Sequence, residues 1–217
     1  MKNTITNEPL SAITHLIAAI LSVAALVLMI VFASLYGSAS HVVGVSIFGV
    51  SMITLYTMST IYHFFAQSHR AKTVLQKLDH GMIYFLIAGT YTPLCLTLPA
   101  RAWGWSMFGI IWALAITGFV LKIVGVQLSR WILLLGYLLM GWLIVVAFQP
   151  LQSWLPTEGL RWLIGGGVFY SLGTIFFVLD SHIPRSRWFG MHEVFHLFVI
   201  AGSFCHFWLM LRYVVFI

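Results

Sequence analysis

Residues 13–36 read ITHLIAAILSVAALVLMIVFASLY, a run of 24 positions that holds no Asp, Glu, Lys or Arg. A helix of about 20 apolar residues crosses the roughly 30 Å hydrocarbon core of a bilayer. The run is too long for the apolar part of a cleaved signal peptide, which has about 7–15 residues. It therefore predicts a retained transmembrane helix at the start of the chain.

The rest of the chain repeats this composition. Of its 217 residues, 61% are hydrophobic and 7% are charged, whereas a typical soluble domain is about 25% charged. So much apolar surface cannot be hidden from water, which excludes soluble enzymes, secreted disulfide scaffolds, coiled coils and disordered proteins. The sequence predicts an all-α membrane protein, a single domain over residues 1–217 with seven transmembrane helices near residues 13–36, 42–66, 79–98, 105–124, 131–148, 160–179 and 192–213.

The basic residues predict the orientation of the chain in the membrane. The net charge is +6, but the cations are scattered between apolar runs, so no nucleic-acid partner is expected. Seven spans place the two termini on opposite faces. The face of the N-terminus holds eight cations: Lys2, Arg70, Lys72, Lys77, Lys122, Arg130, Arg185 and Arg187. The other face holds Arg101, Arg161 and Arg212. The positive-inside rule therefore predicts a cytoplasmic N-terminus and an outside C-terminus.

Several ionisable residues fall at one depth in these spans. His63 lies about one turn from the cytoplasmic end of its span, and Asp79 opens the next one. His192 and His196 occupy the first two turns of the last span. Because burying such groups in a bilayer is costly, they indicate a functional site by default. His206 lies roughly 21 Å deeper than His192 at 1.5 Å per residue, so it is not expected to join them.

This set of residues predicts a metal site. His192 and His196 are four residues apart and share one helix face, and His63 supplies a third imidazole. Three protein ligands and one open position are typical of catalytic zinc. Asp79 then acts as a further ligand or as a general base, and Ser59 donates to a substrate carbonyl or to the bound water. The alternative is that the histidines make ordinary hydrogen bonds at the headgroup level.

Other polar residues leave two interpretations open. His192–Glu193–Val194–Phe195–His196 matches the H-E-x-x-H pattern of zinc proteases, so Glu193 is either the base of an intramembrane protease or a carboxylate favoured at a helix start. Glu8 and His15 either cover the metal site or serve as a helix cap and an interfacial histidine. The remaining loop histidines, expected to be solvated, are His41, His69 and His182.

Taken together, the motifs resemble the hemolysin III group of the progestin and adipoQ receptor (adiponectin-receptor-like) family. The matching pieces are Glu8 with Thr14–His15, STIYH at 59–63, LDH at 78–80, AGTYTP at 88–93, HEVFH at 192–196 and GSFCH at 202–206. The resemblance covers essentially the whole chain. One departure is Ser11, where the family usually has Asn.

The resemblance implies seven helices, a cytoplasmic N-terminus and a location in the bacterial inner (plasma) membrane. It also implies a zinc ion near the cytoplasmic face, held by His63, His192 and His196, with Asp79 in contact through water and Ser59 lining the site. The implied partners are membrane lipids, and a homodimer formed through helix packing stays open.

The leading hypothesis for function is a lipid-directed hydrolase of amide bonds, similar to ceramidases, or a sensor built on the same site that affects lipid homeostasis or membrane energetics. One alternative is a haemolysin-like protein that permeabilises membranes and uses zinc structurally. A second is an ion or proton transporter, but the middles of the spans hold no Asp, Glu, Lys or Arg, which counts against transport.

Overall fold

The computed structural model describes residues 8–65, 70–184, 186 and 189–217. Within that part of the chain every regular element is a helix. The elements are α1 (Pro9–Tyr36), α2 (Ala39–Phe64), α3 (Lys72–Thr97), α4 (Arg101–Val124), α5 (Arg130–Trp142), η1 (Leu143–Ala147), α6 (Phe148–Gln152), α7 (Thr157–Leu179), α8 (Met191–Arg212) and η2 (Val214–Phe216).

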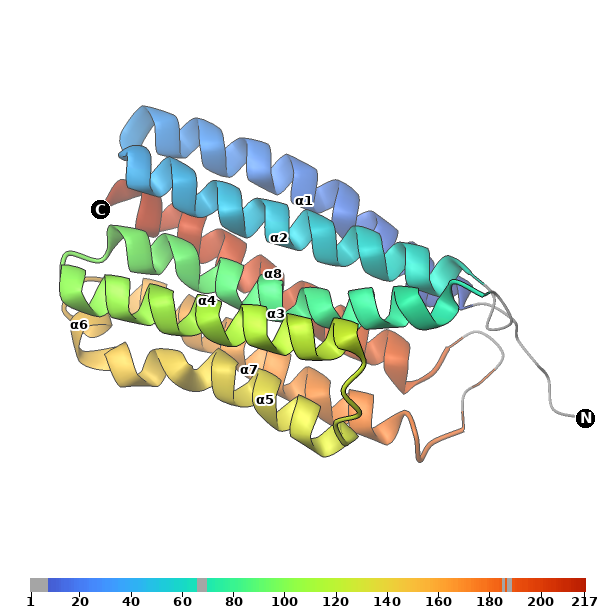
Figure 1. Ribbon diagram of the computed structural model, residues 1–217. Coiled ribbons are helices and arrows are strands. Elements are labelled where there is room, and N and C mark those ends of the chain that lie inside the picture. Colours follow the sequence, from blue (N-terminus) through green and yellow to red (C-terminus); the bar gives the residue numbers. More distant parts are fainter. Residues whose placement is uncertain (1–7, 66–69, 185, 187–188) are drawn as a thin grey trace, which may run out of the picture.

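The long helices form an elongated bundle (Figure 1). α1 packs against α2 and α8, so the first and last long helices are neighbours. α2 also packs against α3, α3 against α4, and α7 against α8. The start of α1 and the C-terminus lie at opposite ends of the bundle (Figure 1).

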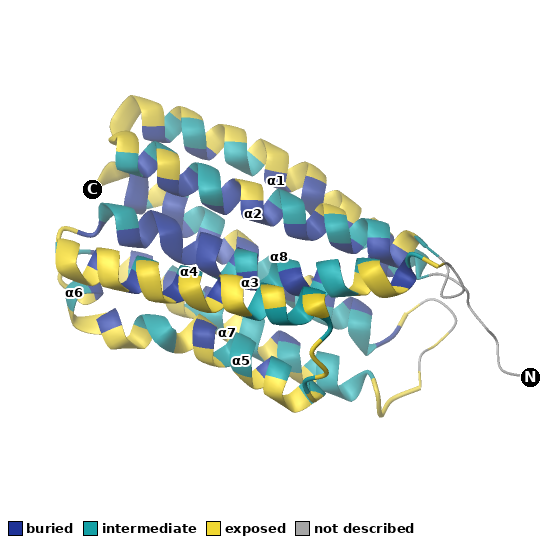
Figure 2. Cartoon of the chain, in the orientation of Figure 1, coloured by how far each residue is buried: buried dark blue, intermediate teal, exposed yellow. Residues whose placement is uncertain are grey.

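The outer surface of the bundle is apolar. Figure 2 shows exposed residues along the outward faces of α1, α4 and α5, where Ile20, Leu35 and Leu139 are each more than 60% exposed. Apolar surface of this extent marks contact with another apolar phase. Six segments are long and apolar enough to cross a membrane, namely α1, α2, α4, α7, Arg130–Gln152 and Met191–Phe216. The prediction of an all-α membrane protein is confirmed.

α3 is not among these six segments, although it is 26 residues long. Its first two turns carry Lys72, Lys77 and Asp79, which lower its apolar character, and much of its surface is buried between neighbouring helices. The count of seven spans and the orientation of the termini therefore stay predictions. Among the residues used for that orientation, Lys2, Arg185 and Arg187 lie outside the described residues.

α3 begins earlier than its apolar residues indicate. The sequence places its start at Asp79, whereas the helix begins at Lys72, about two turns before. Lys72 explains the extension because its Nζ donates to the carbonyl oxygens of Tyr62, at 2.7 Å, and Phe65, at 3.1 Å. The same ammonium group lies 4.0 Å from the centre of the Tyr62 ring. A charged side chain thus ties the start of α3 to the end of α2, beside His63.

The predicted span 131–148 is interrupted. Its α-helical hydrogen bonds end at Trp142, and η1 and α6 carry the segment on to Gln152. At the break the hydroxyl of Tyr91 from α3 lies 2.7 Å and 2.8 Å from the carbonyl oxygens of Met140 and Gly141, and it accepts the N–H of Ile144 at 2.8 Å. A side chain inserted into the backbone ladder is a known cause of helix distortion.

The expectation of a solvated His41 is wrong. Its side chain is 8% exposed, and its Nδ1 accepts the backbone N–H of Ser38 at 3.0 Å, so it closes the first turn of α2. Only Gly37 and Ser38 separate α1 from α2. His41 therefore lies in the first turn of α2 next to this tight connection, where it acts as a helix-capping residue. His182 is exposed, as expected, and His69 lies outside the described residues.

Candidate metal centre

Three histidines from two helices converge near one end of the bundle. His63 comes from the last turn of α2, and His192 and His196 from the first two turns of α8. One ligand nitrogen from each lies within 4.8 Å of the other two. His63 and His196 are each 1% exposed, and His192 is partly buried. The structure thus brings together the three histidines that the sequence singled out.

The geometry of the three rings fits a metal ion. Nδ1 of His63 lies 2.6 Å from Oε2 of Glu8, and Nδ1 of His196 lies 3.3 Å from the hydroxyl of Thr14. These contacts fix the rings through one nitrogen and leave Nε2 available, as outer partners of metal-binding histidines do. Nε2 of His63 and Nε2 of His192 are 3.3 Å apart. Two ligands at about 2.0–2.1 Å from a tetrahedral zinc ion have about this separation.

The start of α1 covers the three histidines. Glu8 precedes α1 but makes no side-chain cap; instead its carboxylate pairs with His63, and its backbone N–H donates to the His63 carbonyl at 3.2 Å. His15 stacks on His196, with ring centres 3.5 Å apart and planes 9° from parallel. His15 is 3% exposed. Of the two interpretations of Glu8 and His15, the structure supports the one in which they cover the site.

Glu193 is held in the position of a helix-start carboxylate. Its Oε2 accepts the backbone N–H of Gly190 at 2.7 Å, and its Oε1 accepts the hydroxyl of Ser11 at 2.6 Å. The side chain is 1% exposed. A carboxylate bonded to the first turn of its own helix stabilises the positive end of that helix. Ser11, the departure from the family pattern, thus joins α1 to α8.

Asp79 and Ser59 lie beside the three histidines but do not belong to the group whose ligand atoms lie within 4.8 Å of one another. Asp79 on α3 is 8% exposed and interacts with both His63 and Ser59. Ser59 on α2 is 2% exposed, and both residues line the same cavity as His192 and His196. The role of Asp79 as metal ligand or as base stays a prediction.

Comparison with known proteins agrees with this arrangement. A model of the family described as "Haemolysin-III related" matches residues 3–207. The chain belongs to the haemolysin-III-related family. It is 42% identical over 217 residues to hemolysin-3 of Bacillus cereus, covering 99% of this chain and 95% of that one. It is 44% identical over 214 residues to a hemolysin-3 homolog of Bacillus subtilis, covering 98% and 96%.

A more distant relative fits the wider grouping expected for a haemolysin-III-related protein. The human monocyte to macrophage differentiation factor is 28% identical over 172 residues, which cover 77% of this chain and 68% of that one. This match fits the hemolysin III group of the progestin and adipoQ receptor family. The resemblance seen in the motifs is confirmed at the level of the family.

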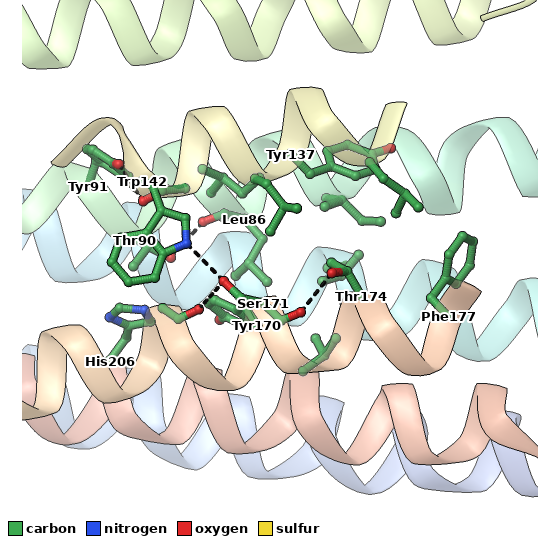
Figure 3. Close-up of a pocket in the computed structure, with 18 of the residues that line it drawn as sticks. Leu86, Thr90, Tyr91, Tyr137, Trp142, Tyr170, Ser171, Thr174, Phe177 and His206 are labelled. Atoms are coloured by element: carbon green, nitrogen blue, oxygen red, sulfur yellow. Dashed lines mark hydrogen bonds between the residues drawn. The ribbon is translucent and has the colours of Figure 1, made fainter. Parts of the chain in front are cut away.

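Two of the three histidines of this haemolysin-III-related protein, His192 and His196, line a large cavity. Its volume is about 520 Å³, within the range of small-molecule sites, and α3, α5, α7 and α8 supply most of its lining. Leucine, isoleucine, valine and aromatic side chains dominate the walls (Figure 3). Asp79, His192 and His196 lie at one end, and His206 also lines the cavity. No sequence motif predicts this cavity, because it arises from helix packing.

The contact between Glu8 and His63 makes Glu8 important for metal affinity. We expect Glu8→Gln to weaken zinc binding about 10–100-fold, the usual cost of losing an outer partner of a metal-binding histidine. The measurement is competition with a zinc chelator of known affinity. Glu158→Gln is the control, since Glu158 is exposed and its nearest partner, Arg161, is 4.0 Å away. Equal zinc affinity in the two variants would contradict this role for Glu8.

Proposed function

We propose that this protein is a zinc-dependent hydrolase of lipid amides, or a lipid sensor built on the same site, in the bacterial inner membrane with its N-terminus in the cytoplasm. One observation carries the proposal: in a group of three closely spaced imidazoles, those of His192 and His196 line an apolar cavity of a membrane protein. Such a cavity suits an acyl chain, and membrane lipids supply acyl chains at this location.

Zinc is the metal that this donor set favours, because three neutral imidazoles with an open fourth position are a common catalytic arrangement. A bound zinc ion polarises a carbonyl group and makes a water molecule more acidic. Glu8 and Thr14 orient His63 and His196 through their other ring nitrogens. The stacked ring of His15 closes the site on the α1 side and excludes water there.

Asp79 and Ser59 supply the remaining chemistry. Both line the cavity beside His192 and His196, so both can reach a carbonyl group placed at that end. The Asp79 carboxylate receives the proton from the attacking water and delivers it to the leaving amine. The Ser59 hydroxyl donates a hydrogen bond to the oxygen on which negative charge develops. The apolar walls hold the acyl chain and fix its carbonyl next to these groups.

The test is release of fatty acid from a long-chain ceramide by the purified protein in detergent. We expect release by the zinc-loaded protein, loss of release after treatment with a chelator, and recovery on adding zinc back. Product is quantified by mass spectrometry. A protein that holds one zinc per chain and cleaves neither ceramide nor other N-acyl lipids would contradict the hydrolase and leave the sensor.

The names of two relatives favour a second candidate. Hemolysin-3 of Bacillus cereus and its Bacillus subtilis homolog carry a name that refers to lysis. A permeabilising function predicts that the purified protein releases a trapped dye from phospholipid vesicles, and that Asp79→Asn releases it equally well. Under the hydrolase proposal, vesicles made of phospholipids alone retain the dye.

A further inference from the structure

His206 is a buried polar residue at a distance from the metal centre. It lies on α8, its side chain is 5% exposed, and it lines the cavity (Figure 3). Its ring stacks on Tyr170 of α7, with centres 5.5 Å apart and planes 27° from parallel. His196 is ten positions earlier on the same helix, so the two residues are roughly 15 Å apart along its axis.

The Nδ1 atom of His206 lacks a hydrogen-bond partner within the described part of the chain. This nitrogen is buried. A neutral imidazole offers one donor and one acceptor, and leaving such groups unpaired in an apolar interior is costly. Polar groups nearby are engaged: the hydroxyl of Thr90 donates to the Leu86 carbonyl at 2.8 Å, and the indole N–H of Trp142 donates to Ser171 at 2.9 Å. His206 therefore has an unused hydrogen-bonding atom with which a ligand can pair.

α7 is shaped to admit this ring. A methyl group added at Gly166 would lie 2.5 Å from Nε2 of His206. The adjacent Gly165 has nothing within 4 Å of the same position. Gly166 thus makes room for His206 beside the cavity, and this explains one member of the Gly165–Gly166–Gly167 run.

We infer that His206 forms a second polar subsite, which recognises a hydroxyl group within the acyl chain of the lipid. A hydroxyl can donate to a bare ring nitrogen or accept from a ring N–H, so it can pair with Nδ1 of His206 in either neutral tautomer. The preferred ligand is a long-chain acyl lipid whose carbonyl lies at the metal centre and whose hydroxyl lies roughly 15 Å along the chain. This inference rests on the proposed function, because it requires that an acyl chain occupies the cavity.

Ricinoleic acid and oleic acid test the inference. They differ by one mid-chain hydroxyl, and neither can be cleaved as an amide. We expect the zinc-loaded full-length protein in detergent to bind ricinoleate about tenfold more tightly than oleate, which is the size expected for hydrogen bonds to an unpaired buried group. Affinity is measured by displacement of a fluorescent fatty acid. In His206→Phe, which keeps an aromatic ring against Tyr170, the ratio falls to about one while oleate affinity is retained.

Two glycine variants test the same inference if His206→Phe does not fold. Gly166→Ala displaces the His206 ring and abolishes the preference for ricinoleate, whereas Gly165→Ala preserves it. Equal binding of both acids by the wild type, or an unchanged preference in His206→Phe or Gly166→Ala, overturns the subsite and leaves the hydrolase standing. Binding of neither acid overturns both, because the cavity then holds no acyl chain.

Discussion

His63→Ala and His196→Ala are each expected to reduce bound zinc from about one ion per chain to less than a tenth. Each change removes one of the three imidazoles whose nitrogens lie within 4.8 Å of one another. Two remaining ligands bind zinc too weakly to survive purification, since stable protein sites use three or four. Metal content is measured by mass spectrometry on protein purified without added zinc.

His182→Ala is the matched control for this experiment. His182 is exposed, its ring contacts Ser181 and the Val178 carbonyl, and it is not one of the three grouped histidines, so we expect this variant to retain its zinc. A wild-type protein without stoichiometric metal, or histidine variants that hold as much zinc as His182→Ala, would contradict the metal centre. Thermal unfolding of the same samples reports how much of the fold depends on the ion.

Asp79→Asn is expected to lower ceramide hydrolysis by about 10²–10⁴-fold, the usual contribution of a general base. Asn has the size and shape of Asp but accepts no proton at neutral pH. Because Asp79 is not one of the three residues grouped by ligand spacing, zinc content and thermal midpoint are expected to stay at the wild-type level. Hydrolysis is followed by release of fatty acid.

Two other outcomes for Asp79→Asn have definite meanings. Loss of zinc together with activity would make Asp79 a ligand and contradict its role as a base. Wild-type activity would assign the proton transfer to another group. Ser59→Ala is the companion variant, for which we expect a smaller loss, since a hydroxyl donor stabilises charge without moving a proton.

The sequence was sufficient for the three histidines because their positions follow from two regular quantities. A spacing of four places His192 and His196 on one helix face, and the length of a membrane span places His63 at the same depth. Both relations survive folding because helices are rigid and a bilayer has a fixed thickness. The presence of Glu8 and His15 at the site could be suspected from their position but not decided, since α1 can rotate about its axis.

Features that depend on contacts between helices could not be predicted from the sequence. The helix that begins with α5 is interrupted where the Tyr91 hydroxyl from α3 bonds to its backbone. No residue within η1 predicts this interruption. The burial of His41 depends on how tightly α1 turns into α2. The free space around Gly165 and the crowded space at Gly166 differ only because His206 faces one of them. Each of these is decided by a partner distant in sequence.

The packing of α1 against α8 also determines when the site can form during synthesis of the chain. Glu8, Ser11, Thr14 and His15 complete a site whose other half, Glu193 and His196, belongs to the last long helix. During synthesis the ribosome must deliver almost the whole chain before these halves can meet. We therefore expect the three-histidine group to be complete only late in assembly, so that metal binding would report a fully inserted chain.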